Sequence, residues 1–174
     1  LMELVLMDEE IPVDLLKKAL RAGVLANDLN LVFVGSAYKN KGVQELLDAV
    51  VDYLPSPLDV PPVTGINPDT DQEEERKPSN KEPFSSLAFK IMTDPFVGKL
   101  SLIKVISGVL TPATPLFNAN ADKPEKAAGI FMVRGKKQIP VGMLCAGDIG
   151  ALSKLQYTST GDTLADYNNP IQYP

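Results

Sequence analysis

A single short apolar segment, residues 29–34, lies between two stretches of helical periodicity and limits what the first third of the chain can form. Its composition, Leu-Asn-Leu-Val-Phe-Val, is typical of a strand covered on both faces in a parallel sheet. Residues 11–23 and 43–54 each repeat apolar side chains at helical spacing, with charged side chains between them. One strand cannot bury two helices. We therefore predict an incomplete α/β unit, whose missing strands lie upstream or on another chain.

The next segment, residues 58–83, loses this periodicity and is rich in proline and acidic residues. Asp69, Asp71 and Glu73 alternate as the first ligands of an EF-hand calcium loop do. The sixth and twelfth positions of that loop would be Glu74 and Asn80, where glycine and glutamate are needed, so a calcium site is rejected. The segment is predicted to be an acidic, proline-rich linker.

Residues 84–166 have the pattern of an all-β domain, with short apolar segments separated by glycine-containing turns. A break in the alternation at Leu102 and Ile103 predicts either a bulge or a strand buried on both faces. A closed barrel fits this short, helix-poor segment better than a sandwich does. The strands are predicted at residues 87–93, 99–107, 116–117, 129–133 and 149–155.

Composition excludes several classes of chemistry within the chain. There is no histidine, and Cys145 is the only cysteine, so Ser-His-Asp or Cys-His catalysis, Cys/His zinc sites and internal disulfides are ruled out. Cys145 lies in an apolar context and is interpreted as a small core residue. The net charge of −5 argues against a general nucleic-acid polycation. A lone cysteine and the lack of a membrane-length apolar run predict a cytoplasmic chain, and the first residue, Leu1, indicates a piece of a longer protein.

Two short motifs are candidates for binding. Gly35, Ser36 and Ala37 follow the predicted strand, where free backbone N–H groups and small side chains let a ligand approach, although a purely structural turn remains an alternative. The next residues, 40–43, lack the carboxylate of the guanine-reading Asn-Lys-x-Asp motif. Arg134, Gly135, Lys136 and Lys137 form the one compact basic cluster, either a solvated hairpin tip or a contact to phosphates.

Two longer blocks resemble bacterial elongation factor G. Residues 35–57 are similar to the end of its GTPase domain, and residues 88–100 are similar to the opening of its second domain. Shorter motifs at residues 107–108, 146–149 and 160–164 follow in the order of that family. The resemblance covers essentially the whole chain. It implies an α/β remnant followed by a translation-protein-type β-barrel.

The resemblance also implies a division into domains and a function. Residues 1–57 would end a P-loop GTPase domain, 58–83 would be the linker, 84–166 the barrel called domain II, and 167–174 the start of a linker to the next domain. The parent protein would be a ribosome-dependent GTPase that promotes tRNA and mRNA translocation. Its barrel would contact its own GTPase domain and the RNA and proteins of the small ribosomal subunit.

The same resemblance assigns roles to the candidate residues. Gly35, Ser36 and Ala37 would be the last guanine-contacting loop, with a backbone N–H donating to the base. The basic cluster, with Arg134, Lys136 and Lys137, would contact ribosomal RNA. GTP or GDP with Mg²⁺ is expected in the full-length protein. None is expected on this chain, which lacks the phosphate-binding loop and should be inactive alone.

The chain departs from the usual pattern of the family at some positions. Residues 133–137 differ from the common Met-His-Ala-Asn type of sequence, and Lys104 and Ile106 replace a frequent arginine and tyrosine, which indicates an elongation factor G-like paralogue. Two alternatives are kept: a stand-alone RNA- or protein-binding barrel, and a ribosome protection or release relative of the same GTPase family. Neither a membrane nor DNA is expected as a partner.

Overall fold

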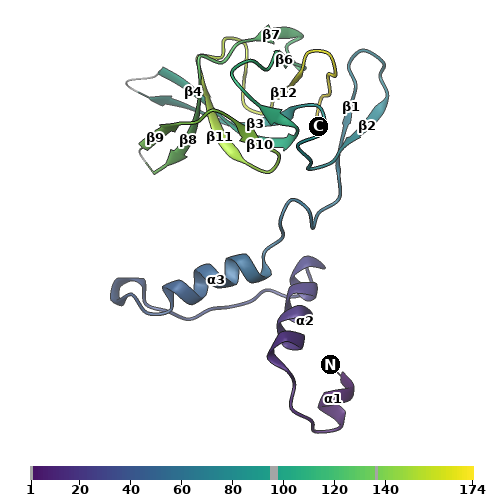
Figure 1. Cartoon of the computed structure of the whole chain (residues 1–174), viewed down its shortest axis with the longest axis vertical. Coiled ribbons are helices and arrows are strands. Elements are labelled where there is room, and N and C mark those ends of the chain that lie inside the picture. Colours follow the sequence, from purple (N-terminus) through teal and green to yellow (C-terminus); the bar gives the residue numbers. More distant parts are fainter. Residues whose placement is uncertain (1, 95–97, 136) are drawn as a thin grey trace. The chain divides into compact units, whose positions relative to one another are not determined.

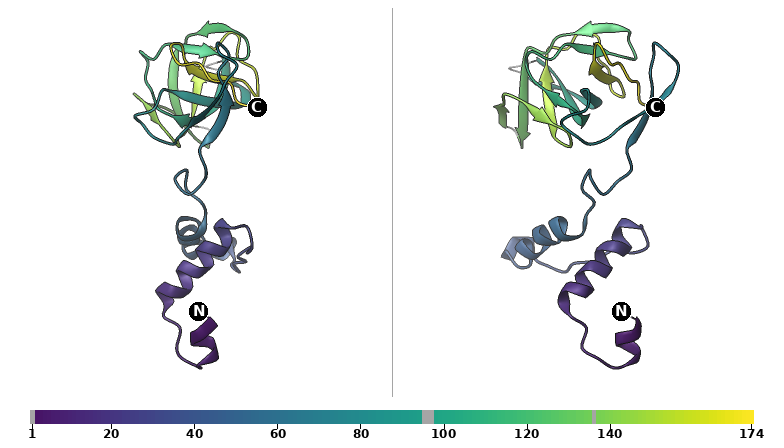
Figure 2. Two further views of the ribbon diagram at one scale, coloured as in Figure 1. Left: turned by 90° about the vertical axis from the view of Figure 1, so that its right-hand side faces the viewer. Right: turned by 45° about the vertical axis from the view of Figure 1, so that its right-hand side comes forward.

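The computed structural model describes residues 2–94, 98–135 and 137–174, and it divides the chain into two compact units, Leu1–Val60 and Pro61–Pro174 (Figure 1). The first unit is helical and the second is built almost entirely of strands. Figure 2 shows the same two units from two further directions. Each unit is described by itself below.

The first unit contains the two predicted helices. The elements are α1 (Met2–Leu6), α2 (Val13–Leu25), the 3₁₀ turn η1 (Ala37–Lys39) and α3 (Val43–Tyr53). Pro12 occupies the N-cap of α2 with extended backbone angles, where its missing N–H costs no hydrogen bond. The C-cap of α3 is Leu54, whose extended conformation is the one favoured before Pro55. Both helices begin and end within a few residues of the predicted positions.

Charged contacts join α2 to α3 and to the residues that follow α3. Lys17 Nζ lies 2.8 Å from a carboxylate oxygen of Asp52, and Arg21 donates to the Asp52 backbone oxygen at 2.7 Å. Arg21 also pairs with Asp59 at 2.6 Å. The Asp52 carboxylate raises the pKa of Lys17, and the backbone N–H of Ser56 lowers the pKa of Asp59. These contacts hold the two helices together where there is little apolar burial.

The strand predicted at residues 29–34 is absent, and this prediction was wrong. The segment has no strand assignment, and Val32 and Val34 are 86% and 94% exposed. A strand needs a hydrogen-bonded partner, and the described part of the first unit offers none. The apolar segment thus has the composition of a buried strand without the neighbours that would bury it.

The second unit is an eight-stranded antiparallel sheet with the order β7-β6-β12-β3-β4-β11-β8-β9, supplemented by the short pair β5-β10 (Figure 1). Glycines at positive φ, such as Gly98, Gly108 and Gly161, lie at its turns. The bounds are β3 (Ser85–Asp94), β4 (Gly98–Ser107), β5 (Val109–Leu110), β6 (Leu116–Asn118), β7 (Lys123–Glu125), β8 (Gly129–Arg134), β9 (Lys137–Pro140), β10 (Leu144–Cys145), β11 (Ile149–Ser153) and β12 (Thr163–Asp166). All five predicted strands are present. The predicted all-β fold is confirmed.

The larger of two apolar clusters lies inside the curled sheet. It gathers side chains from β3, β4, β6, β8, β11 and β12, so strands that are distant in the sheet order cover the same interior. Alternation along β4 explains the pattern, because Ile103 and Val105 are fully buried while Lys104 between them is exposed. Burying such side chains contributes about 1.5–3 kcal/mol each, which is the main stabilisation of the barrel.

The break in alternation at Leu102 and Ile103 corresponds to a bulge on the opposite strand. Ala88 pairs with Ile103 and Lys90 pairs with Leu102, so Phe89 is the extra residue in β3. Its side chain is 41% exposed. The expected irregularity exists, but β3 carries it rather than β4. A bulge of this kind increases the local twist, which helps a sheet curl.

The segment predicted as a linker is more ordered than its composition indicates. It contains a hairpin of β1 (Val63–Ile66) and β2 (Glu73–Arg76), and residues 61–83 belong to the second unit. The C-terminal residues are also part of this unit, since Ile171 and Tyr173 are buried and Gln172 exchanges two 2.8 Å backbone hydrogen bonds with Ile66. The isolated backbone bridge between Ile66 and Gln172, which the local sequence does not reveal, holds the acidic hairpin against the C-terminal residues.

Candidate functional site

The predicted binding residues Gly35, Ser36 and Ala37 lie in a closed loop between the unpaired apolar segment and α3. The Ser36 N–H donates to the Lys41 carbonyl oxygen at 2.9 Å, and the Lys41 N–H donates back to the Ser36 carbonyl at 3.0 Å. Between them the chain forms η1, and Asn40 takes a left-handed conformation with φ 50°. The loop therefore has a fixed backbone shape although most of its residues are exposed.

Two glycines allow the two ends of this loop to approach each other closely. A Cβ added at Gly35 would lie 2.8 Å from the Lys41 carbonyl oxygen. A Cβ at Gly42 would lie 3.2 Å from the Val34 carbonyl oxygen, and Gly42 also has a φ of 73°. The first distance is too short for any side chain. Gly35 is thus required by the geometry of the loop itself.

The loop presents backbone donors to solvent. Ala37 and Tyr38 begin η1, and the first N–H groups of a helical turn have no acceptor within it. Ala37 and Tyr38 are both exposed residues, and the backbone hydrogen bonds of this loop include neither of their N–H groups as a donor. Free N–H groups in a rigid loop can bind a carbonyl oxygen or an anion. This is the chemistry that the predicted guanine contact needs.

An apolar groove of about 270 Å³ lies in the same unit, between α2, α3 and the segment before the loop. It is lined mainly by apolar side chains, among them Leu31, Phe33, Leu46 and Val50. Val50 is 47% exposed although it lies on the apolar face of α3. The groove leaves apolar side chains of this unit open to solvent.

The basic cluster lies at the tip of the β8–β9 hairpin. Arg134 and Lys137 are paired directly opposite each other, next to Gly135 with a φ of 58°. Lys136, the third predicted contact, lies outside the described residues. Both described side chains are exposed, and the ion pairs of the described residues include neither of them. Like charges opposite each other destabilise a hairpin slightly, and a polyanion bound there would remove that cost.

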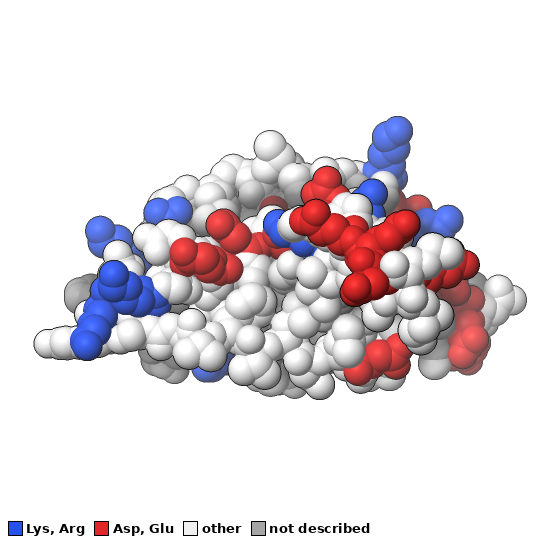
Figure 3. All heavy atoms as spheres, turned by 90° about the horizontal axis from the view of Figure 1, so that it is seen from below, with Lys and Arg blue, Asp and Glu red and all other residues white. Residues whose placement is uncertain are grey.

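On the face shown in Figure 3, acidic and basic side chains are both exposed, and the basic ones lie in separate groups.

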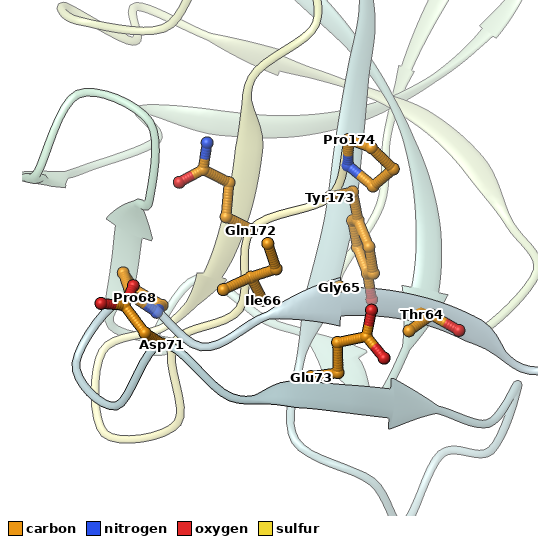
Figure 4. A pocket seen from close by; sticks show the side chains of 9 residues that line it. All are labelled: Thr64, Gly65, Ile66, Pro68, Asp71, Glu73, Gln172, Tyr173 and Pro174. Carbon is orange, nitrogen blue, oxygen red and sulfur yellow. The ribbon is translucent and has the colours of Figure 1, made fainter.

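A cavity of about 540 Å³ lies between the β1–β2 hairpin and the C-terminal residues (Figure 4). Its lining combines apolar side chains such as Ile66 and Pro68 with the carboxylates of Asp71 and Glu73. Sequence reasoning missed this cavity, because it depends on the pairing of Gln172 with β1. Among the described residues no cluster of acidic or cysteine side chains is arranged to hold a metal ion.

A buried carboxylate fixes a loop on the barrel. Glu125, 8% exposed, accepts hydrogen bonds from the backbone N–H groups of Gln156, Tyr157 and Thr158 and from the Thr158 hydroxyl, at 2.7–3.0 Å. Lys99 Nζ donates to the Thr158 carbonyl oxygen at 2.6 Å. No periodic pattern in the sequence pointed to this contact, since it joins residues about thirty positions apart. We call residues 154–158 the 154–158 loop.

Comparison with known proteins identifies the architecture of the second unit. Residues 83–167 match the family model described as elongation factor G domain 2. The barrel has the fold of elongation factor G domain 2. A crystal structure of a protein from Thermus thermophilus superposes with a TM-score of 0.69 over 97% of this chain at 24% identity. This chain spans 23% of the length of that protein.

The comparison confirms the translation-protein-type barrel expected from the sequence resemblance, within residues 83–167. Gly35, Ser36 and Ala37 lie in the loop before and at the start of η1, and Arg134 and Lys137 are paired at the β8–β9 tip; their binding roles stay predictions. Among the described residues, no helix is both long and apolar enough to span a bilayer.

Proposed function

We propose that this chain is part of a ribosome-dependent translational GTPase that promotes tRNA and mRNA translocation. The observation that carries the proposal is the match of residues 83–167 to elongation factor G domain 2. The unpaired segment and apolar groove of the first unit support it, because a P-loop GTPase domain would supply the missing parallel strands. Such a protein acts in the cytoplasm.

In this proposal the loop at Gly35, Ser36 and Ala37 completes the guanine pocket. Its free N–H groups donate to the carbonyl oxygen of the base, and its rigid shape keeps them in place. GTP or GDP with Mg²⁺ is bound by the full-length protein, whose phosphate-binding loop lies outside this sequence. The chain alone neither binds nor hydrolyses GTP.

The barrel binds its own GTPase domain and the small ribosomal subunit. The tip at Arg134 and Lys137, together with Lys136, contacts the phosphates of ribosomal RNA. Exposed basic side chains outside the ion pairs of the described residues are suited to this, because each contact with a phosphate releases a counterion. These contacts position the factor and carry little sequence information.

The guanine contact is tested in the longer protein that contains this chain. Gly35→Ala places a methyl group against the Lys41 carbonyl and displaces the loop, so GDP affinity falls by the value of one hydrogen bond, about 0.5–1.5 kcal/mol. Isothermal titration calorimetry measures it. Gly142→Ala is the matched control, since a Cβ there meets nothing within 4 Å. Equal GDP affinity in the two variants refutes the assignment.

The RNA contact is tested by the salt dependence of ribosome binding. Reversing the charges of Arg134 and Lys137 to glutamate should flatten the slope of log K against log salt, while Lys77→Glu on the exposed end of the hairpin segment should change it less. An unchanged slope removes these residues from the interface. Failure of the longer protein to bind the ribosome at all would favour the stand-alone binding module. If the longer protein binds the ribosome but acts in ribosome protection or release instead of translocation, the related members of the GTPase family are favoured.

A further inference from the structure

The 154–158 loop has features of a binding surface that the proposed function does not use. Tyr157 is 45% exposed, while its neighbours Leu155 and Thr158 are buried. The ring is therefore held outward on a backbone that is fixed on both sides. The bonds to the Glu125 carboxylate and the bond from Lys99 provide that fixation. A rigid exposed aromatic ring loses little entropy when a flat partner stacks on it.

Lysines lie near this ring. Lys123 Nζ lies over one face of the Tyr157 ring, 4.5 Å from its centre, so a stacking base would use the opposite face. Lys154 begins the loop, and its N–H donates to the Lys99 carbonyl oxygen. Lys126 follows Glu125 directly, and the chain beyond it returns to the loop through the hydrogen bond from Ala128 to Ser153. The backbone contacts thus bring all three lysines to the same end of the barrel.

These lysines stand outside the ion pairs of the described residues. Lys123, Lys126 and Lys154 are exposed, and none of those ion pairs includes them. The nearby carboxylate of Glu125 is buried and bonded to the loop backbone. The charge that faces solvent near Tyr157 therefore comes from these three lysines and from the exposed carboxylate of Asp122, which precedes Lys123, on a chain whose net charge is −5.

This surface is separate from the β8–β9 tip. Ser153, which precedes the loop, pairs with Gly129 at one end of β8, whereas Arg134 lies at the other end. Five residue steps along a strand correspond to about 17 Å. One short contact at the hairpin tip cannot account for both basic groups.

We propose that the 154–158 loop binds single-stranded RNA, with an unpaired base stacked on Tyr157 and backbone phosphates at Lys123, Lys126 and Lys154. Aromatic rings bordered by cations are the usual platform for single-stranded nucleic acids, because every base has a face that can stack. A base within a duplex cannot reach the ring. The proposal does not depend on guanine nucleotide binding or on the ribosome.

The test is a fluorescence anisotropy titration of the full chain with a labelled single-stranded RNA of about ten nucleotides. Salt is varied between about 50 and 200 mM, because phosphate contacts weaken with salt. Tyr157→Ala should weaken binding about tenfold, and Tyr157→Phe, which keeps the ring, should bind nearly as the wild type does. Far-UV circular dichroism and urea midpoints verify that each variant is folded.

Lysine variants separate a local contact from general charge. Lys154→Gln should lower the slope of log K against log salt by about 0.7, the value for one phosphate of a single strand. Lys18→Gln makes the same change of charge on an exposed residue of α2 and should leave the slope as it is. An equal effect of the two substitutions would overturn the proposal.

Two other probes identify the partner. A labelled RNA duplex and an acidic peptide are titrated under the same conditions. Preference for the single strand supports the proposal, and equal or tighter binding of either alternative overturns it. Absence of RNA binding at the lowest salt, or an affinity that Tyr157→Ala leaves unchanged, overturns it as well. Each of these failures leaves the GTPase proposal untouched.

Discussion

Replacing Glu125 with glutamine should destabilise the barrel by about 2 kcal/mol. In the wild type, Oε1 accepts three hydrogen bonds from Tyr157 and Thr158, and Oε2 accepts one from the Gln156 N–H at 3.0 Å. A glutamine side chain keeps the three bonds to Oε1 only by turning its NH₂ group toward the Gln156 N–H. Two donors then face each other, and one hydrogen bond to a charged group is lost.

The magnitude follows from these contacts. A hydrogen bond to a charged group contributes about 1.5–3 kcal/mol, and the remaining three bonds weaken when the charge is removed. Glutamine avoids the cost of burying a carboxylate, which offsets much of that weakening. Glu125→Ala has no such compensation and leaves three backbone N–H groups without their acceptor, so it should cost at least about 4 kcal/mol.

Urea unfolding followed by far-UV circular dichroism measures both losses. Glu75→Gln is the control, because it removes the same charge from an exposed side chain of β2 and should change the free energy of unfolding by less than about 0.5 kcal/mol. Hydrogen exchange at the amides of residues 156–158 gives a local measure. Wild-type stability in Glu125→Gln, or unchanged exchange at these amides, would refute the view that this carboxylate holds the loop.

Other substitutions test the turns, the core and one buried hydroxyl. Gly108→Ala should lower the free energy of unfolding in urea by at least about 3 kcal/mol, because the new Cβ meets backbone atoms at 2.6 Å. Gly161→Ala is also at positive φ but has open space around it, so it should cost only about 1–2 kcal/mol. Equal losses in the two variants would contradict the steric argument. Leu152→Ala should cost about 2–5 kcal/mol, and Met132→Ala, 40% exposed, much less; similar values would place the core elsewhere. Burial raises the pKa of Tyr173, because the folded protein favours the neutral phenol. The neutral Tyr173 therefore contributes its full stabilisation of the fold below the ordinary tyrosine pKa of about 10, and this contribution is lost as the pH rises through the higher pKa of the folded state. Tyr173→Phe should therefore flatten the alkaline fall in the free energy of unfolding, and an unaltered fall would assign it to other groups.

The sequence was sufficient for elements that depend on local pattern. Both long helices were predicted because their apolar positions repeat at helical spacing, and proline marks the ends of that pattern near Pro12 and Pro55. The alternation along β4 likewise predicted a strand with one buried face. The all-β nature of residues 84–166 followed from several such segments with glycine turns between them.

Features that depend on distant partners were not predictable in the same way. Residues 29–34 have a strand composition, but no strand forms without a neighbour to share its backbone hydrogen bonds. The acidic segment around Glu73 has the composition of a linker, yet it pairs as a hairpin whose outer edge is bonded to Gln172. Composition describes how a segment interacts with water, and it does not tell which other segment lies beside it.

The candidate sites also differ in whether a local pattern or a distant contact defines them. Gly35, Ser36 and Ala37 were proposed from the sequence because small residues after an apolar segment are a local signal, and the structure adds the contact with Lys41 that makes Gly35 necessary. The rigid setting of Tyr157 has no local signal, since its fixation comes from Glu125. The sequence by itself determined the helices, the β-rich second part and its turns through side-chain periodicity and glycine and proline positions. Only the tertiary structure decided the edge pairing of the hairpin, the bulge in β3 and the buried carboxylate, because hydrogen bonds between distant residues form only when the whole sheet brings them together.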